Sequence, residues 1–161
     1  MSAEAPNAAQ AAYWNETVGP TWADLHAPLD RQLAGVTLRA IAALRPHVEG
    51  RLIIVFGAGG DRDQGKRPQM GAVATRLSDI VIVTDDNPRS EDPARIRADV
   101  MVGAPDALEV GGRREAIAEA IRLSAAGDII LVAGKGHETG QIVGDRVLPF
   151  DDVTVARECA A

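Results

Sequence analysis

The sequence is poor in cysteine, in aromatic residues and in long apolar runs, and it has no excess of positive charge. Its single cysteine, Cys159, excludes an internal disulfide bond and a structural zinc site built from cysteines. Seventeen Lys and Arg against 23 Asp and Glu give a formal charge of −6, which argues against a surface that coats nucleic acid. No apolar stretch approaches the roughly 20 residues of a membrane span, and the first residues lack the layout of a signal peptide. We therefore expect a cytoplasmic protein with no nucleic-acid or membrane partner.

Aromatic residues make up only 3% of the 161 residues, and three of them lie near the start: Tyr13, Trp14 and Trp22. The core beyond residue 50 must therefore consist of Val, Ile, Leu and Ala. This composition is typical of parallel strands that are covered by helices on both faces. With 46% apolar residues, the chain can form one such hydrophobic core.

Apolar runs and amphipathic segments alternate along the chain. The pattern predicts buried strands at 51–56, 80–83 and 129–133, a further strand at 107–110, and helices at 30–44, 68–77, 92–100, 114–125 and 151–155. In the helix over 68–77, the buried face is expected to consist of Met70, Val73, Ala74 and Leu77. Strands at 141–143 and 146–148 flank a Gly-Asp turn and predict a hairpin. The expected fold class is therefore α/β: a Rossmann-like, mostly parallel sheet flanked by helices, with a C-terminal hairpin.

Three polar loops that contain glycine follow three of the predicted strands. They read GAGGDRDQGKR (57–67), DDNPR (85–89) and GKGHETG (134–140). Ligands of parallel α/β sheets bind beyond the carboxyl ends of the strands. We therefore expect the three loops to share one site.

The first loop comes close to two nucleotide-binding motifs and matches neither. Gly60 and Lys66 have the spacing of a phosphate-binding loop, but Arg67 stands where a Ser or Thr would hold Mg²⁺. The third glycine of the dinucleotide fingerprint falls on Arg62. A plain turn would explain the glycines, but it would not explain four charges at the end of a strand: Asp61, Arg62, Asp63 and Lys66.

The other two loops carry groups that suit a zwitterion. Arg89 offers a planar fork for a carboxylate, and Asn87 offers both a donor and an acceptor. Glu138 can receive an ammonium group, whereas a lone histidine such as His137 is more often structural. A solvated turn would explain residues 85–89 equally well. Taken together, the charges of the three loops favour an amino acid over a purely anionic ligand: Arg62, Lys66, Arg89, Asp86 and Glu138.

The same loops resemble those of a known family. The runs GAGGDRDQGKRP (57–68), TDDNPRSEDP (84–93) and VAGKGHE (132–138) are similar to the C-terminal domain of the Mur ligases, in particular those that add meso-diaminopimelate to a peptidoglycan precursor. The resemblance covers about residues 37–158 and implies a domain that binds the incoming amino acid. The ligand contacts that it implies are Arg62, Asn87, Arg89, Gly134, Glu138 and Asp86. It also implies Asp61 and Lys66 as candidates near the phosphate groups of ATP.

The resemblance further implies that the chain lacks parts that ligation needs. In the family, a central domain holds ATP and Mg²⁺, and an N-terminal domain binds the UDP group. We therefore expect that this chain binds no cofactor and no metal alone, has no complete catalytic site and is inactive as a ligase by itself.

The first residues resemble a different family. The run YWNETVGPTWADLH (13–26) is similar to the opening of class I S-adenosylmethionine-dependent methyltransferases. This predicts a chimera of two units, 1–36 and 37–161. Because the aromatic side chains of the first unit favour burial, it also predicts a homodimer through that segment. The alternative functions are a methyltransferase-like domain, with Asp85 or Asp86 at the ribose of its cofactor, and a folded scaffold without a retained ligand.

Overall fold

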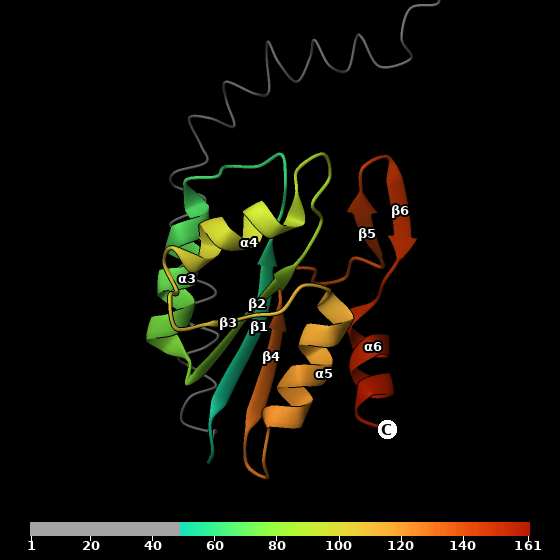
Figure 1. Ribbon diagram of the computed structural model, residues 1–161. Helices are drawn as coiled ribbons and strands as arrows, with labels where there is room; N and C mark the ends of the chain where they lie inside the picture. The colour runs from blue at the N-terminus through green and yellow to red at the C-terminus, as the bar shows by residue number, and fades with distance from the viewer. Residues whose placement is uncertain (1–48) are drawn as a thin grey trace, which may run out of the picture. The chain divides into compact units, whose positions relative to one another are not determined.

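A computed structural model describes residues 49–161 of the chain (Figure 1). Helices and strands alternate along this part. They are β1 (Leu52–Ala58), α3 (Lys66–Leu77), β2 (Ile80–Asp85), α4 (Pro93–Met101), β3 (Leu108–Glu109), α5 (Arg113–Leu123), β4 (Ile129–Ala133), β5 (Gly140–Val143), β6 (Arg146–Pro149) and α6 (Asp152–Cys159). The helix expected over 30–44, the methyltransferase-like segment and a dimer through that segment all lie outside the described residues.

Four strands form a parallel sheet in the order β3-β2-β1-β4, and β5 and β6 form a separate antiparallel hairpin. The predicted fold class is therefore confirmed. From β1 the chain first adds β2 and β3 on one side and then places β4 on the other. The strand order thus reverses between β1 and β4, and such a reversal is where α/β sheets bind ligands. The carboxyl ends of both strands point toward the top of Figure 1, where the three polar loops begin.

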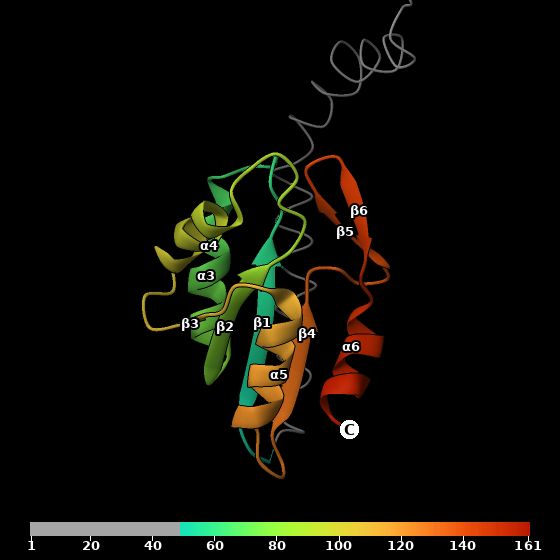
Figure 2. The same ribbon diagram turned by 45° about the vertical axis from the view of Figure 1, so that its right-hand side comes forward.

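Helices cover both faces of the sheet (Figures 1 and 2). On one face, alternate residues of β1 such as Ile54 and Phe56 pack against α3 and α4. On the other face, Ile53 and Val55 pack against α5 and α6. This two-sided burial explains why β1 and β2, the most deeply buried strands, read as continuous apolar runs. Within residues 49–161, no helix is long and apolar enough to cross a membrane.

The buried face predicted for α3 is confirmed in part. Ala74 is buried and Val73 and Leu77 are half-buried, whereas Met70 is 37% exposed. The other buried residues of this helix are Arg67 and Gly71, which the apolar pattern did not include. The reason is the close approach of α3 to α4: a Cβ at Gly71 would lie 2.3 Å from the carbonyl oxygen of Val100. Gly71 therefore allows α3 to approach α4 closely, and this contact turns Met70 outward.

Helix capping follows the sequence closely. The Asp92 side chain accepts a hydrogen bond from Ala94 N at the start of α4, with Pro93 at its first position. At α6, Asp151 is the capping residue, accepting from Thr154 N, and the helix extends to Cys159. In the hairpin, Gly144 has a φ of +56°, a conformation that favours glycine.

Candidate functional site

The three polar loops meet at the carboxyl edge of the sheet, as the sequence predicts. Gly60 N of the first loop donates to Asn87 O of the second, at 2.9 Å. The Asn87 side chain donates through Nδ2 to Glu138 Oε2 of the third loop, at 2.8 Å. Arg89 N donates to Ile142 O, at 3.1 Å, so the hairpin also joins this group of loops.

Asn87 lies at the centre of these contacts and is only 4% exposed. Its Oδ1 accepts hydrogen bonds from Lys135 Nζ at 3.1 Å and from Ile142 N at 2.9 Å. Its Nδ2 is the donor to Glu138. The carboxamide is therefore held at both ends, and one N–H of Nδ2 remains beyond the bond to Glu138.

Arg89 and Arg62 differ in how firmly the structure holds them. Arg89 has a φ of +53°, and its Nη1 donates to Gly60 O at 2.8 Å and to Asn87 O at 3.3 Å. Its Nε and Nη2 make no hydrogen bond with the described residues. Arg62 is exposed, and its Nη1 lies 3.5 Å from Asp61 O. Arg89 is thus fixed in place, whereas Arg62 can reorient toward a ligand.

Asp61 joins the first loop to the residue that directly follows the second loop. Its carboxylate accepts from Ser90 Oγ at 2.6 Å and from Ser90 N at 3.2 Å. Like Arg89, Asp61 has a positive φ, +53°. Lys66, the other candidate near phosphate, is the first residue of α3 and is half-buried.

A buried arginine that the sequence analysis assigned no contact fastens the first loop. Arg67 is 2% exposed and donates to both carboxylate oxygens of Glu91, at 2.8 and 3.0 Å, and to Asp99 Oδ2, at 2.9 Å. It also donates to Gly59 O, at 3.2 Å. Hydrogen bonds from Arg67, and a further one from Asp61 N, lower the pKa of Glu91 to about 2. Glu91 is therefore ionised throughout the physiological range.

Gly134 follows β4 directly and lies near two charged side chains, Asp86 and Arg113. Its φ is +113°, and a Cβ there would lie 3.7 Å from Asp86 Oδ2 and 4.0 Å from Arg113 Nη1. Arg113 is 1% exposed and forms a two-pronged ion pair with Asp152, both contacts at 2.7 Å. A side chain at position 134 would thus be strained and would cover Asp86, which explains why glycine stands there.

Sequence reasoning therefore missed three buried cations at this edge: Arg67, Lys135 and Arg113. From sequence alone, a basic residue is expected to be exposed to solvent, because Lys and Arg are rarely buried without a partner. One signal was available for Lys135. It lies between two glycines directly after a buried strand, where the chain must turn sharply.

Asp85, one of the two candidate ribose ligands of a methyltransferase-like domain, makes contacts that hold the fold together. Its carboxylate accepts from Arg97 Nη1 and, at 2.9 Å, from Gly112 N. These contacts join the end of β2 to α4 and to the start of α5. They leave Asp86 as the acid of this pair that faces the three loops.

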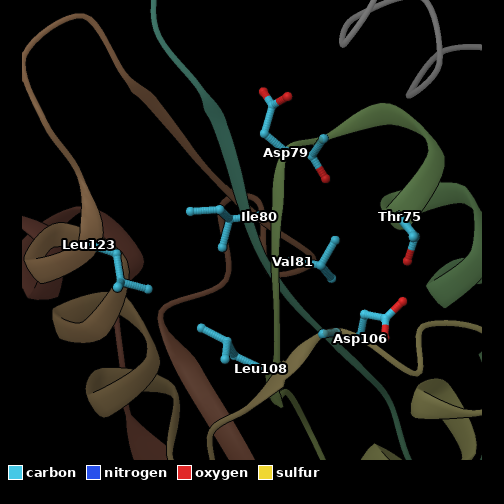
Figure 3. A pocket seen from close by; sticks show the side chains of 9 residues that line it. Thr75, Asp79, Ile80, Val81, Asp106, Leu108 and Leu123 are labelled. Atoms are coloured by element: carbon cyan, nitrogen blue, oxygen red, sulfur yellow. The ribbon is translucent and has the colours of Figure 1, made fainter.

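A cavity of about 340 Å³ opens at the opposite, amino edge of the sheet (Figure 3). Ile80, Val81, Leu108 and Leu123 line it together with short polar residues. None of the predicted site residues lies there. Among residues 49–161, no three His, Cys, Asp or Glu side chains are arranged to hold a metal ion.

Comparisons with known proteins match most of the chain to one family. Residues 36–136 match the family described as "Mur ligase, glutamate ligase domain". The UDP-N-acetylmuramoyl-L-alanyl-D-glutamate–2,6-diaminopimelate ligase of Zymomonas mobilis is 68% identical over 123 residues, which are 74% of this chain and 25% of that protein. The ligase of the same name from Caulobacter vibrioides is 65% identical over 113 residues, which are 70% of this chain and 23% of the relative.

A solved structure of a ligase with this name superposes with a TM-score of 0.72 at 42% identity. It covers 76% of this chain and 26% of the solved one. The chain thus spans about a quarter of the length of the curated relatives that it matches. It belongs to the Mur ligase family, and its matched residues correspond to the C-terminal domain of the diaminopimelate-adding ligases.

Proposed function

We propose that residues 37–161 bind meso-diaminopimelate, or an amino acid of the same charge pattern, at the three loops of the carboxyl edge. The observation that carries the proposal is the buried Asn87 carboxamide, held against Glu138 Oε2 at 2.8 Å and adjoining Arg89. A diamino dicarboxylic acid needs cationic donors for a carboxylate and an anionic acceptor for an ammonium group. The named activity of the relatives, which join 2,6-diaminopimelate, supports the same ligand.

Each site residue has a proposed role. Arg89 and Asn87 donate to the distal carboxylate, and Glu138 accepts from the distal ammonium group. Arg62, which is exposed and free to reorient, closes on the ligand from the first loop. Gly134 lets the ligand approach the backbone, and Asp86 adds a second negative charge beside it. Asp61 and Lys66 remain proposals for contact with nucleotide phosphate. The hydrogen bond from Ser90 Oγ holds the Asp61 carboxylate in place there.

Calorimetric titration of the 161-residue chain with meso-diaminopimelate tests this proposal. We expect saturable one-site binding that R89M and E138Q each weaken at least tenfold, because each removes a charged partner of the ligand. R122M is the matched control, since Arg122 is exposed on α5 and pairs with Glu119. Equal binding by the wild type and by both site variants would contradict the proposal, as would binding of S-adenosylmethionine in place of the amino acid.

We also propose that this chain does not catalyse ligation by itself. Joining a carboxyl group to an amine through an acyl phosphate requires ATP, Mg²⁺ and the activated carboxyl group held in line with the nucleophile. The site described above contributes the amino acid that attacks, and in the full-length family other domains supply the rest. Diaminopimelate-dependent release of phosphate from ATP by the purified chain would refute this.

The remaining predictions concern residues 1–36 and the location of the protein, and they stay proposals. They are the two-unit division at residue 36, the chimeric origin, the homodimer and the cytoplasmic location. The family match begins at residue 36, which supports a boundary there. Light scattering on the chain with and without residues 1–25 tests the dimer: a mass that does not change on deletion would contradict a dimer formed through this segment.

A further inference from the structure

A fully buried charge beside the proposed ligand contacts is Lys135, which neither the sequence pattern nor the resemblance identified as a site residue. Its side chain is 0% exposed. Nζ donates to Gly140 O at 2.6 Å and to Asn87 Oδ1 at 3.1 Å. It also lies 3.5 Å from Asp86 Oδ1 and 3.7 Å from Glu138 Oε2. Four of its neighbours are therefore oxygen acceptors, and three of these belong to proposed ligand contacts.

We propose that Lys135 is a positioning residue that sets which ligand-facing groups are donors and which are acceptors. This inference rests on the proposed function, because it concerns the same site. The two ends of an asparagine carboxamide have nearly the same shape, so packing alone does not decide its orientation. Lys135 decides it together with Ile142 N and the Glu138 carboxylate, because an ammonium group can only donate.

The contacts of Asn87 show how this works. Oδ1 faces two donors, Lys135 Nζ and Ile142 N. Rotating the carboxamide by half a turn would place its NH₂ group against both donors and its oxygen against the Glu138 carboxylate. The rotated state thus loses three hydrogen bonds and gains repulsion. Asn87 is left with one N–H of Nδ2 for the ligand, and this donor suits a carboxylate and rejects an ammonium group.

Lys135 also sets the charge of the acidic side of the site. Asp86 and Glu138 carry two negative charges, and the buried ammonium group neutralises one of them. Removing it makes the site more negative and favours cationic ligands. L-lysine lacks the distal carboxylate of diaminopimelate and keeps both amino groups. The ratio of the diaminopimelate affinity to the L-lysine affinity therefore measures the effect of the Lys135 charge.

The first measurement needs no ligand. The chain has two lysines, Lys66 and Lys135, so the NMR signals of their ammonium groups are simple to assign. We expect Lys135 NζH₃ and the Asn87 side-chain amide to exchange slowly with water in the wild type. In K135M the Asn87 amide should exchange at least tenfold faster, while R122M leaves it unchanged. Equal exchange of the Asn87 amide in the wild type and in K135M would overturn the inference.

The second measurement is calorimetry with meso-diaminopimelate, L-lysine and 2-aminopimelate, which lacks the distal amino group. We expect K135M to lower the affinity ratio of diaminopimelate to L-lysine about tenfold or more. K135Q keeps a donor for Asn87 Oδ1 and removes the charge. It should protect the Asn87 amide and still shift the ratio, and it carries the test if K135M does not fold.

The outcomes separate this inference from the proposed function. If Lys135 were needed only for folding, K135M would lower the affinity for all three ligands by the same factor. The ratio of the diaminopimelate to the L-lysine affinity would then stay unchanged, and this result would overturn the inference. If the wild type binds none of the three ligands, the proposed function fails. The exchange of the Asn87 amide in K135M then still decides whether Lys135 sets its orientation.

Discussion

The two edges of the parallel sheet use side chains of opposite charge to form hydrogen bonds with backbone groups at the strand ends. At the amino edge, carboxylates accept from backbone N–H groups: Asp79 Oδ2 accepts from Leu52 N at 2.8 Å, and Asp128 Oδ1 accepts from Arg51 N at 2.7 Å. At the carboxyl edge, buried cations donate to carbonyl groups. Arg67 donates to Gly59 O at 3.2 Å, and Arg113 donates to Ala133 O at 3.0 Å.

The cause is the direction of the strands. Parallel strands end with unpaired N–H groups at one edge and unpaired C=O groups at the other, and each needs a partner of opposite polarity. The edges differ in what else their charges do. The amino-edge acids contact residues that hold the fold together, whereas one carboxyl-edge cation, Lys135, also contacts two acids of the three loops, Asp86 and Glu138. The charges of the carboxyl edge therefore connect stability with the proposed binding site.

The largest effect is expected from breaking a buried pair at the carboxyl edge. Arg113 and Asp152 are 0% and 12% exposed at their side chains. Arg113→Met leaves Asp152 without its partner, so we expect the free energy of unfolding to fall by about 3–5 kcal/mol. Urea denaturation measures this.

The matched control for this variant is Arg114→Met on the same helix, whose partner Glu158 is exposed. It should leave the urea midpoint unchanged. The double variant R113M/D152L removes both charges and should recover part of the loss. Equal midpoints for R113M and R114M would show that burial does not separate the two pairs.

The next largest effect concerns the contact between the first two loops. A Cβ at Gly60 would lie 1.8 Å from Pro88 O, so Gly60→Ala must push the backbones apart. We expect a loss of about 1–3 kcal/mol in unfolding free energy, together with weaker diaminopimelate binding, because residues 57–65 carry Arg62. Gly65→Ala is the control, since Gly65 has an ordinary φ of −65° and its nearest contact is a side-chain oxygen of Asp63 at 3.2 Å. The same loss in both variants would refute the argument.

A smaller effect at the amino edge sharpens the comparison between stability and binding. Asp79→Ala removes the acceptor of Leu52 N and should lower the unfolding free energy by about 1 kcal/mol. Diaminopimelate affinity should stay within twofold of the wild type, because Asp79 lies at the edge opposite the loops. Chemical denaturation and calorimetry on one preparation measure both quantities. A fall in affinity that parallels the fall in stability would mean that the two edges are coupled.

The smallest effect is a pH dependence that both edges share. Hydrogen bonds from Arg67 lower the pKa of Glu91 to about 2, and hydrogen bonds from Arg51 lower that of Asp128 to about 2. A folded-state pKa below the unfolded one contributes stability that is fully present above the unfolded pKa of about 4 to 4.5. It is lost as the pH falls from there toward 2. Glu91→Gln should therefore flatten the acid limb of the stability curve, and an unchanged limb would contradict this.

Most of the fold was predictable because it depends on local patterns. The run 51–56 is apolar without alternation, which is typical of a strand buried on both faces, and it became β1. Asp92 with Pro93 marked the start of α4 because capping needs only neighbouring residues. On α3, the burial of Gly71 and the exposure of Met70 could not be predicted in this way. They depend on the distance to Val100 on another helix, which no periodicity within α3 contains.

The residues of the candidate site could be predicted from the sequence, but the contacts that hold them in place could not. Glycines, charges and proline after strands marked the three loops, and parallel topology brought Gly60, Asn87 and Glu138 into contact. The sequence left Asp61 and Lys66 as candidates near phosphate. The structure shows Asp61 bound to Ser90, a contact between residues 29 positions apart that no local pattern contains.

By itself, the sequence determined the alternation of strands and helices, the edge at which the loops gather and the family to which they belong. These follow from apolar periodicity, from the rule that parallel strands share an edge and from motifs that are continuous in the chain. Only the tertiary structure decided which charges are buried. Lys135, Arg67 and Arg113 became internal because acids and carbonyl groups distant in the chain surround them. A buried charge is stable only when such partners are in place, so the fold had to form before the cations of this site could be recognised.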